Sequence, residues 1–187
     1  MFGESRRALL LLHLQNEVVD PDGHVGRRGI GQVVADRGVL ATAERARLEF
    51  DESGEPVVHV VFERPASSAL QWSTAPHLRE PPEEAFVPGG WGSQVPDGLA
   101  RPGDERVVHH TMSALAGTGL RGRLANEGIT AVVLAGVSTH LVVAATAFAA
   151  SDAGLEVEVI AAACASPTPE LQQAGLAICA AVGRVRA

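Results

Sequence analysis

The chain has 187 residues, of which 46% are hydrophobic and 20% are charged, and its formal net charge at pH 7 is −7. This length suits a single globular domain with a full hydrophobic core, which we assign to residues 1–187. The negative charge argues against nucleic-acid binding, the apolar runs are too short to span a membrane, and two cysteines give no disulfide framework, so we expect a cytoplasmic protein.

The first part of the chain predicts two strands separated by a loop and a helix. Residues 8–14 and 57–62 are apolar runs of the length and composition of buried strands. Residues 18–31 are rich in turn-forming residues and predict a loop, while residues 33–53 have the apolar spacing of one amphipathic helix. A loop at the ligand edge of a sheet can fold over a pocket, so we expect His24 to contribute to that pocket.

The rest of the chain predicts strands that alternate with helices. Strands are expected at residues 104–109, 131–135 and 155–161, and helices at residues 119–127, 140–152 and 167–181. Residues 63–106 are rich in proline and predict no long helix. The alternation predicts an α/β fold, with a three-layer, doubly wound, mainly parallel sheet and helices on both faces.

The turn after the strand at residues 131–135 is the first place to look for chemistry. Gly136 breaks the apolar run, and Ser138 and Thr139 offer side-chain oxygens to the helix that follows. A strand that runs into a helix in this way places the turn at the carboxyl edge of the sheet. Open α/β proteins bind their ligands along that edge.

Four sequence elements resemble those of the isochorismatase-like cysteine hydrolases. The segment from Gly136 to Val143 resembles the family's G-V-x-T-x-x-C-V turn, and Leu12-His13-Leu14-Gln15-Asn16 resembles its D-x-Q-N element. Residues 109–118 (HHTMSALAGT) resemble K-x-x-x-S-A-F-x-x-T, and residues 162–166 (AACAS) resemble D-A-x-x-S. The resemblance covers most of the chain. It implies the family's fold and a cis peptide bond between Val137 and Ser138.

The catalytic positions depart from the family's pattern. Members that hydrolyse amides use an aspartate, a lysine and a cysteine, and the resemblance places His13, His109 and Val142 at these three positions. The chain contains no lysine, and valine cannot act as a nucleophile, so the covalent thioester route is excluded. The resemblance keeps Ser138, Thr139 and Val142 at the backbone turn that faces the substrate oxygen.

Two histidines in place of the aspartate and the lysine keep an acid–base pair with pKa values nearer neutrality. Relatives that resemble isochorismatase cleave a vinyl ether without a covalent intermediate. We therefore expect an enzyme: a noncovalent hydrolase, lyase or cyclase in which His13 and His109 are catalytic and no cofactor takes part. Its substrate would be a small, fairly apolar molecule. The substrate-binding candidates are Gln15, His24, Phe62, Trp72, Trp91, His110 and His140.

Two alternatives stay open. A metal such as zinc, iron or copper could bind three imidazoles, supplied by His13, His109 or His110, and His140. However, Glu63-Arg64-Pro65 occupies the place where metal-binding relatives carry their ligands. The chain could instead be an inactive pseudoenzyme that binds a small molecule or serves as an oligomeric subunit. Family members are usually dimers or tetramers, so the resemblance implies a homodimer or homotetramer.

Three further residues that could carry chemistry are expected to be structural. His59 lies inside a predicted strand, where a histidine is usually a bonded core residue. Cys164 follows the last large strand and Cys179 lies on the apolar side of the final helix. Both thiols are expected to be buried and inert.

Overall fold

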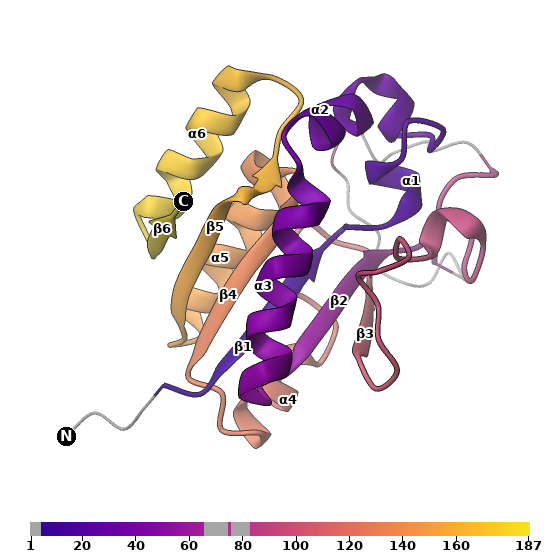
Figure 1. Ribbon diagram of the computed structural model, residues 1–187. Helices are drawn as coiled ribbons and strands as arrows, with labels where there is room; N and C mark the ends of the chain where they lie inside the picture. Colours follow the sequence, from indigo (N-terminus) through magenta and orange to yellow (C-terminus); the bar gives the residue numbers. More distant parts are fainter. Residues whose placement is uncertain (1–4, 66–74, 76–82) are drawn as a thin grey trace.

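A computed structural model describes residues 5–65, 75 and 83–187, and these residues form three layers around a parallel sheet (Figure 1). The sheet has six strands in the order β3-β2-β1-β4-β5-β6. The strands are β1 (Arg7–Leu12), β2 (Val57–Phe62), β3 (Glu105–His109), β4 (Ala131–Val137), β5 (Glu156–Ala165) and β6 (Arg184–Arg186). Each neighbouring pair is parallel, which confirms the predicted fold class.

Helices cover both faces of the sheet. They are α1 (Asn16–Val19), α2 (Ile30–Asp36), α3 (Val39–Ser53), α4 (Leu120–Asn126), α5 (Ala144–Asp152) and α6 (Pro169–Ala180). Shorter turns are the 3-10 turns Gly26–Arg28 and Trp91–Ser93 and the π-helical turn Thr139–Val143. Helices α2 and α3 pack into the core on one face, and α4, α5 and α6 pack into the core on the other. Within the described residues, no helix is long and apolar enough to cross a membrane.

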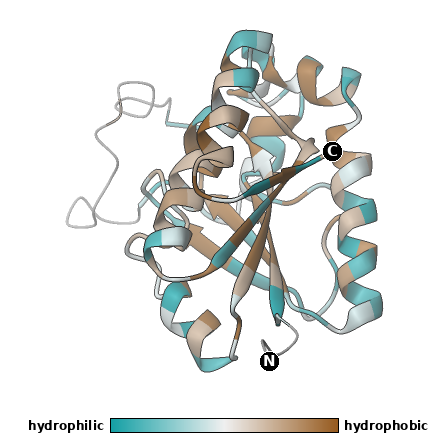
Figure 2. Ribbon diagram, turned by 90° about the vertical axis from the view of Figure 1, so that its left-hand side faces the viewer, coloured by the Kyte–Doolittle hydropathy of each residue, from teal (hydrophilic) through white to brown (hydrophobic). Residues whose placement is uncertain are grey.

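The central strands are apolar on both sides because both of their faces are buried. Leu9 and Leu11 of β1 point into one core, while Leu10 and Leu12 point into the other. All four side chains are at most 1% exposed. Burying each one stabilises the fold by about 1.5–3 kcal/mol. Figure 2 shows this arrangement as hydrophobic strands at the centre, with hydrophilic residues on the outer sides of the helices.

Several elements differ from the prediction. The single helix expected at residues 33–53 is two helices, because Gly38 adopts a left-handed conformation (φ 62°) between α2 and α3. The loop expected at residues 18–31 contains short helical turns. The strand expected at residues 155–161 continues to Ala165, and the short edge strand β6 beside it was not predicted.

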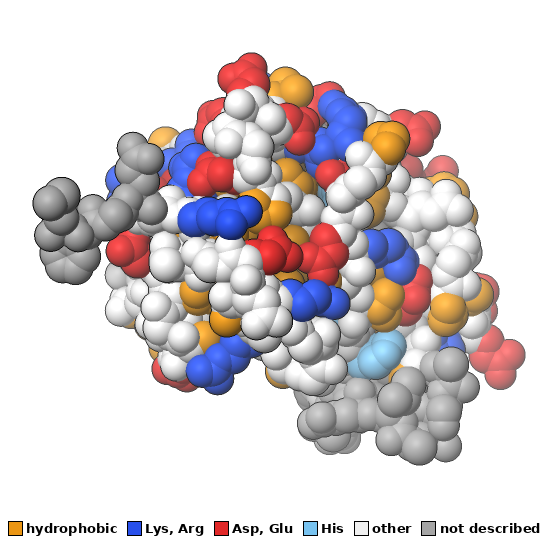
Figure 3. Space-filling view, turned by 90° about the horizontal axis from the view of Figure 1, so that it is seen from below, with side chains coloured by type: hydrophobic (Ala, Val, Ile, Leu, Met, Phe, Trp, Pro, Cys, Tyr) orange, Lys and Arg blue, Asp and Glu red, His pale blue; other side chains and the backbone are white. Residues whose placement is uncertain are grey.

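The carboxyl ends of the strands form the edge where the site lies. His13 directly follows β1, Phe62 ends β2, His109 ends β3, and Ser138 directly follows β4. The opposite side of the molecule, seen from below, carries arginine and acidic side chains intermixed over the surface (Figure 3). Ion pairs such as Arg123 with Glu105, 2.7 Å apart, fit this mixture of signs.

Candidate functional site

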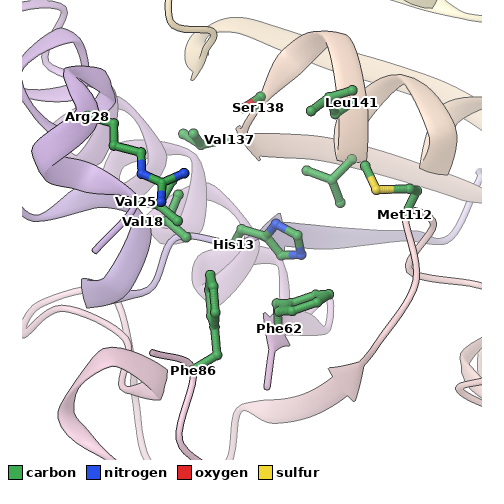
Figure 4. A pocket seen from close by; sticks show the side chains of 11 residues that line it. His13, Val18, Val25, Arg28, Phe62, Phe86, Met112, Val137, Ser138 and Leu141 are labelled. Carbon is green, nitrogen blue, oxygen red and sulfur yellow. The ribbon is translucent and has the colours of Figure 1, made fainter. Parts of the chain in front are cut away.

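His13 is held at the end of β1 in an uncommon backbone conformation. Its φ angle is 53°, in the left-handed region that residues other than glycine rarely adopt. Its backbone N–H donates a 2.8 Å hydrogen bond to the carbonyl of Val60, which ties it to β2. Such a conformation costs roughly 1–3 kcal/mol and tends to persist at functional sites. The imidazole of His13 lines a cavity at this edge of the sheet (Figure 4).

His109 lies against His13. The two Nε2 atoms are 2.5 Å apart, and the ring centroids are 4.7 Å apart with the planes tilted by 46°. The Nδ1 atom of His109 is 3.3 Å from the carbonyl oxygen of Ser113, which can only accept. Nδ1 therefore carries the proton and donates, so Nε2 of neutral His109 is an acceptor and Nε2 of His13 is the donor.

The protonation state of His109 follows from its burial. The side chain is 1% exposed, and burial lowers its pKa from 6.5 to about 4. His109 is thus a neutral imidazole near pH 7. Phe62 supports both rings edge-on, with its centroid 5.8 Å from that of His13 and 5.8 Å from that of His109.

The cavity is small and mainly apolar, with a volume of about 120 Å³. Its apolar wall consists of Val18, Val25, Phe62, Phe86, Met112, Val137, Leu141 and Val142. The polar groups in the wall come from His13, Arg28 and Ser138. His109 does not line the cavity, so a molecule bound there would meet His13, with His109 behind it.

The turn after β4 forms one wall of this cavity. The peptide between Val137 and Ser138 is cis, as the resemblance implied, and Ser138 lines the cavity. The carbonyl of Ser138 accepts hydrogen bonds from the N–H groups of Leu141 and Val143, at 3.2 and 3.3 Å. Val142 also lines the cavity, so the turn presents an alkyl side chain there.

Thr139 belongs to the support behind the turn. It is fully buried, and its hydroxyl donates a 2.6 Å hydrogen bond to Oε1 of Gln172 in α6. The amide nitrogen of Gln172 donates in turn to the carbonyl of Cys164, at 3.2 Å. This buried chain of hydrogen bonds joins the turn to α6 and to β5. Thr139 therefore holds the turn in place and does not line the cavity.

Gln15, which the sequence suggests as a substrate-binding residue, has a structural position instead. The side chain is fully buried and does not line the cavity. Its Oε1 accepts from the N–H of Phe62 at 2.7 Å, and its Nε2 donates to the carbonyls of Phe62 and Gly92, both at 3.0 Å. All of these partners are backbone groups, so Gln15 fixes the position of Phe62.

His110 and His140 bond away from the cavity. Nδ1 of His110 donates to the carbonyl of Glu63 at 2.8 Å, and Nδ1 of His140 lies 2.9 Å from the hydroxyl of Ser166. Neither side chain lines the cavity. Among residues 5–65, 75 and 83–187, no three His, Cys, Asp or Glu side chains form a group that could hold a metal ion. The structure therefore does not bring the three imidazoles of the metal alternative together.

The remaining expected contacts lie around the cavity mouth or outside it. Trp91 is 50% exposed and does not line the cavity, and Trp72 lies outside the described residues. His24 does not line it either, but its Nε2 is 2.9 Å from a guanidinium nitrogen of Arg28, which does. The sequence analysis missed Arg28, because nothing in the pattern of a polar turn marks an exposed arginine as part of a cavity wall.

The cysteines and His59 have the structural roles expected for them. Cys164 and Cys179 are fully buried, and burial raises the pKa of their thiols to about 12 and about 11. His59 is 3% exposed, and its Nε2 lies 2.9 Å from a carboxylate oxygen of Asp104. None of the three lines the cavity.

Comparison with known proteins matches residues 7–186 to the isochorismatase domain. The isochorismatase family protein YecD of Escherichia coli O157:H7 is 31% identical over 170 residues, covering 87% of this chain and 81% of that protein. The pyrazinamidase/nicotinamidase of Streptococcus mutans UA159 has a similar structure, with a TM-score of 0.80 at 20% identity, covering 96% of this chain and 99% of that chain. The N-carbamoylsarcosine amidase of Thermoplasma acidophilum gives a TM-score of 0.70 at 25% identity, covering 97% of this chain and 95% of that chain.

Proposed function

The chain belongs to the isochorismatase family, and we propose that it is an enzyme of that family that works by noncovalent acid–base chemistry. It would act as a hydrolase, lyase or cyclase on a small, fairly apolar metabolite. Val142 replaces the cysteine, so the nucleophile must be water or a group of the substrate itself. The observation that carries the proposal is the direct contact between His13 and His109 at the wall of the cavity.

The two histidines would have unequal roles. His13 would exchange a proton with the substrate, because it lines the cavity. His109, buried and neutral with a pKa lowered to about 4, would accept a hydrogen bond from Nε2–H of His13 and so stabilise His13 while it carries the proton taken from the substrate. His13 is thus the catalytic residue, and His109 acts through it. General acid–base catalysis of this kind typically contributes about 10²–10⁴-fold in rate.

The surroundings support this chemistry. The wall beside His13 is mainly apolar and His109 is buried, and electrostatic interactions are stronger where less water is present. The carbonyl of Ser113 fixes the tautomer of His109, and the edge of Phe62 limits the movement of both rings. Nε2 of His109 is therefore held as a hydrogen-bond acceptor for Nε2–H of His13. No step of this mechanism requires a metal or an organic cofactor.

The test is to measure turnover by the purified protein on panels of small amides, esters and enol ethers. Wild-type protein, His13→Asn and Val142→Ala would be compared. His59→Asn serves as a control, because His59 is a buried histidine outside the cavity. Activity that is lost in His13→Asn and kept in folded His59→Asn supports the proposal. Full activity in His13→Asn would contradict it.

A second function, that of an inactive oligomeric subunit, is considered because two neighbouring helices expose large apolar side chains. Helices α5 and α6 pack side by side and expose Phe148 (45%), Leu171 (38%) and Ile178 (41%). We propose that a homodimer or homotetramer buries this face. Light scattering coupled to size exclusion would measure the assembly, and Phe148→Glu should dissociate it. Small molecules that bind to the folded protein without being turned over would favour the subunit over the enzyme.

A further inference from the structure

Arg28 is the one basic side chain in the described part of the cavity wall, and no described aspartate or glutamate lines that wall. It ends the 3-10 turn Gly26–Arg28, and Figure 4 shows its guanidinium turned toward the cavity from the side of Val18 and Val25. The Arg28 side chain is exposed, and its guanidinium can donate several hydrogen bonds in a fixed plane to an anion at the cavity wall.

Arg28 differs from Arg47 and Arg106 in its partners. Arg47 bonds both carboxylate oxygens of Asp104, at 2.6 and 2.8 Å, and Arg106 lies 2.6 Å from Glu63. Arg28 instead contacts the neutral acceptor Nε2 of His24, at 2.9 Å. In the regions that the structure describes, no carboxylate lies within ion-pair distance of Arg28. Its charge is therefore not neutralised by those residues.

The position of Arg28 is built into the fold. The buried carboxylate of Glu17 accepts hydrogen bonds from the backbone N–H groups of His24, at 2.5 Å, and of Phe86, at 3.2 Å. Gly26 lies so close to the carbonyl of Asp20 that an added Cβ would fall 1.8 Å from that oxygen. Glu17 thus fixes His24, which contacts Arg28, and it also fixes Phe86 on the cavity wall.

We infer that the substrate is a small carboxylic acid, with its carboxylate bound by Arg28 and its apolar body inside the cavity. This inference rests on the proposed function, because it assigns the reacting bond to the His13 end of the same cavity. The cavity of about 120 Å³ is slightly smaller than an apolar cavity of roughly 150 Å³ that holds a benzene ring, so it suits a body no larger than a compact ring or a short branched chain. The acid group then remains at the wall where Arg28 lies.

Because the molecule as a whole is negatively charged, binding of an anion in the cavity depends on the nearby positive charge of Arg28. The net charge of −7 repels anions at long range, but salt at physiological strength screens that repulsion beyond about 8 Å. No described acidic side chain lines the cavity wall, so the guanidinium of Arg28 has no carboxylate beside it in that wall. An uncharged isostere of the acid gains nothing from Arg28 beyond a neutral hydrogen bond, and this difference can be measured.

The test uses benzoate and benzamide, which share a ring and differ in charge. Their affinities for the purified protein would be measured by ligand-observed NMR at low and physiological salt. We expect wild-type protein to bind benzoate more tightly than benzamide. Arg28→Gln should weaken benzoate binding about tenfold or more and leave benzamide binding nearly unchanged. Arg28→Lys should retain part of the affinity, because it keeps the charge and loses the planar fork.

Arg27→Gln is the matched control. It removes the same charge from the adjacent residue, whose guanidinium does not line the cavity. Benzoate affinity should therefore stay at the wild-type level in Arg27→Gln. Equal benzoate affinity in wild-type protein and folded Arg28→Gln would overturn the inference, as would no benzoate binding by wild-type protein. These binding measurements do not depend on turnover. A negative result would therefore overturn the role of Arg28 alone, and the acid–base role of His13 would still be tested by the activity of His13→Asn.

Discussion

His13 and His109 meet through their Nε2 atoms at 2.5 Å, and of the two only His13 lines the cavity described here. The contact is asymmetric because Nδ1–H of His109 donates to the carbonyl of Ser113, which leaves Nε2 of neutral His109 as an acceptor. Two groups that share one hydrogen bond titrate together, so replacing either one changes the behaviour of the other. The unequal positions of the two imidazoles predict unequal effects of their replacement.

His13→Asn should lower the turnover rate roughly a hundredfold or more, because the group that exchanges the proton is removed. His109→Leu should cause a smaller loss and also shift the pH–rate profile to lower pH, since the neutral acceptor that stabilises protonated His13 is gone. His109→Gln, which keeps an acceptor oxygen, should restore part of the wild-type profile. The measurement is the pH dependence of kcat and KM for each folded variant. An unshifted profile in His109→Leu would show that His109 has no part in the proton transfer.

Thiol reagents should leave the protein active and unlabelled. The thiols of Cys164 and Cys179 are buried, and their pKa values are raised to about 12 and about 11, so little thiolate forms near pH 8. Iodoacetamide followed by mass spectrometry should detect labelling only after unfolding. Val142→Cys is the matched test, because it places a thiol on the cavity wall. That thiol should react first, and faster labelling of Cys164 than of residue 142 would contradict the assigned positions.

Gln15→Leu should destabilise the protein with little effect on substrate affinity. The amide of Gln15 makes hydrogen bonds to backbone groups of Phe62 and Gly92, and leucine would leave these groups buried without that partner. An unpaired buried polar group costs about 1–3 kcal/mol, so urea denaturation should show a loss of at least that size. KM per folded molecule should stay close to the wild-type value. A large rise in KM without loss of stability would instead support the substrate-binding role expected from the sequence.

The sequence predicted the parts of the fold that buried surface defines. The runs at β1, β2 and β4 are apolar on both faces, which identifies central parallel strands. Strand β6 has only three residues, two of them arginines, and therefore carries no such pattern. At the sheet edge, Arg184 and Arg186 of this strand form ion pairs with Glu158 of the neighbouring strand β5.

For the site, the sequence predicted which strand ends carry histidines, but not how these side chains are arranged. That His13 lines the cavity and His109 lies behind it depends on the left-handed backbone of His13, which no residue pattern reveals. Gln15 could not be separated from substrate-binding residues, since a buried amide and a ligand-facing amide look alike in sequence. That the exposed Arg28 lines the cavity depends on how its turn lies beside segments distant from it in the chain, such as β2 and the turn after β4.

Protein stability should fall as the pH is lowered from about 6.5 toward about 4, because buried histidines must stay neutral in the folded state. Burial lowers the pKa of His109 from 6.5 to about 4, and burial also lowers that of His59. Between those two pH values the unfolded chain binds a proton at His109 that the folded chain does not, so the stabilisation is complete above about 6.5 and is lost as the pH falls. For His109 alone this amounts to about 3 kcal/mol, since one pKa unit corresponds to 1.36 kcal/mol.

Urea denaturation at intervals between pH 7 and pH 4 would measure this loss of stability. His109→Gln should flatten the pH dependence relative to wild-type protein. An equally steep loss of stability in His109→Gln would show that His109 is not the buried neutral group described here.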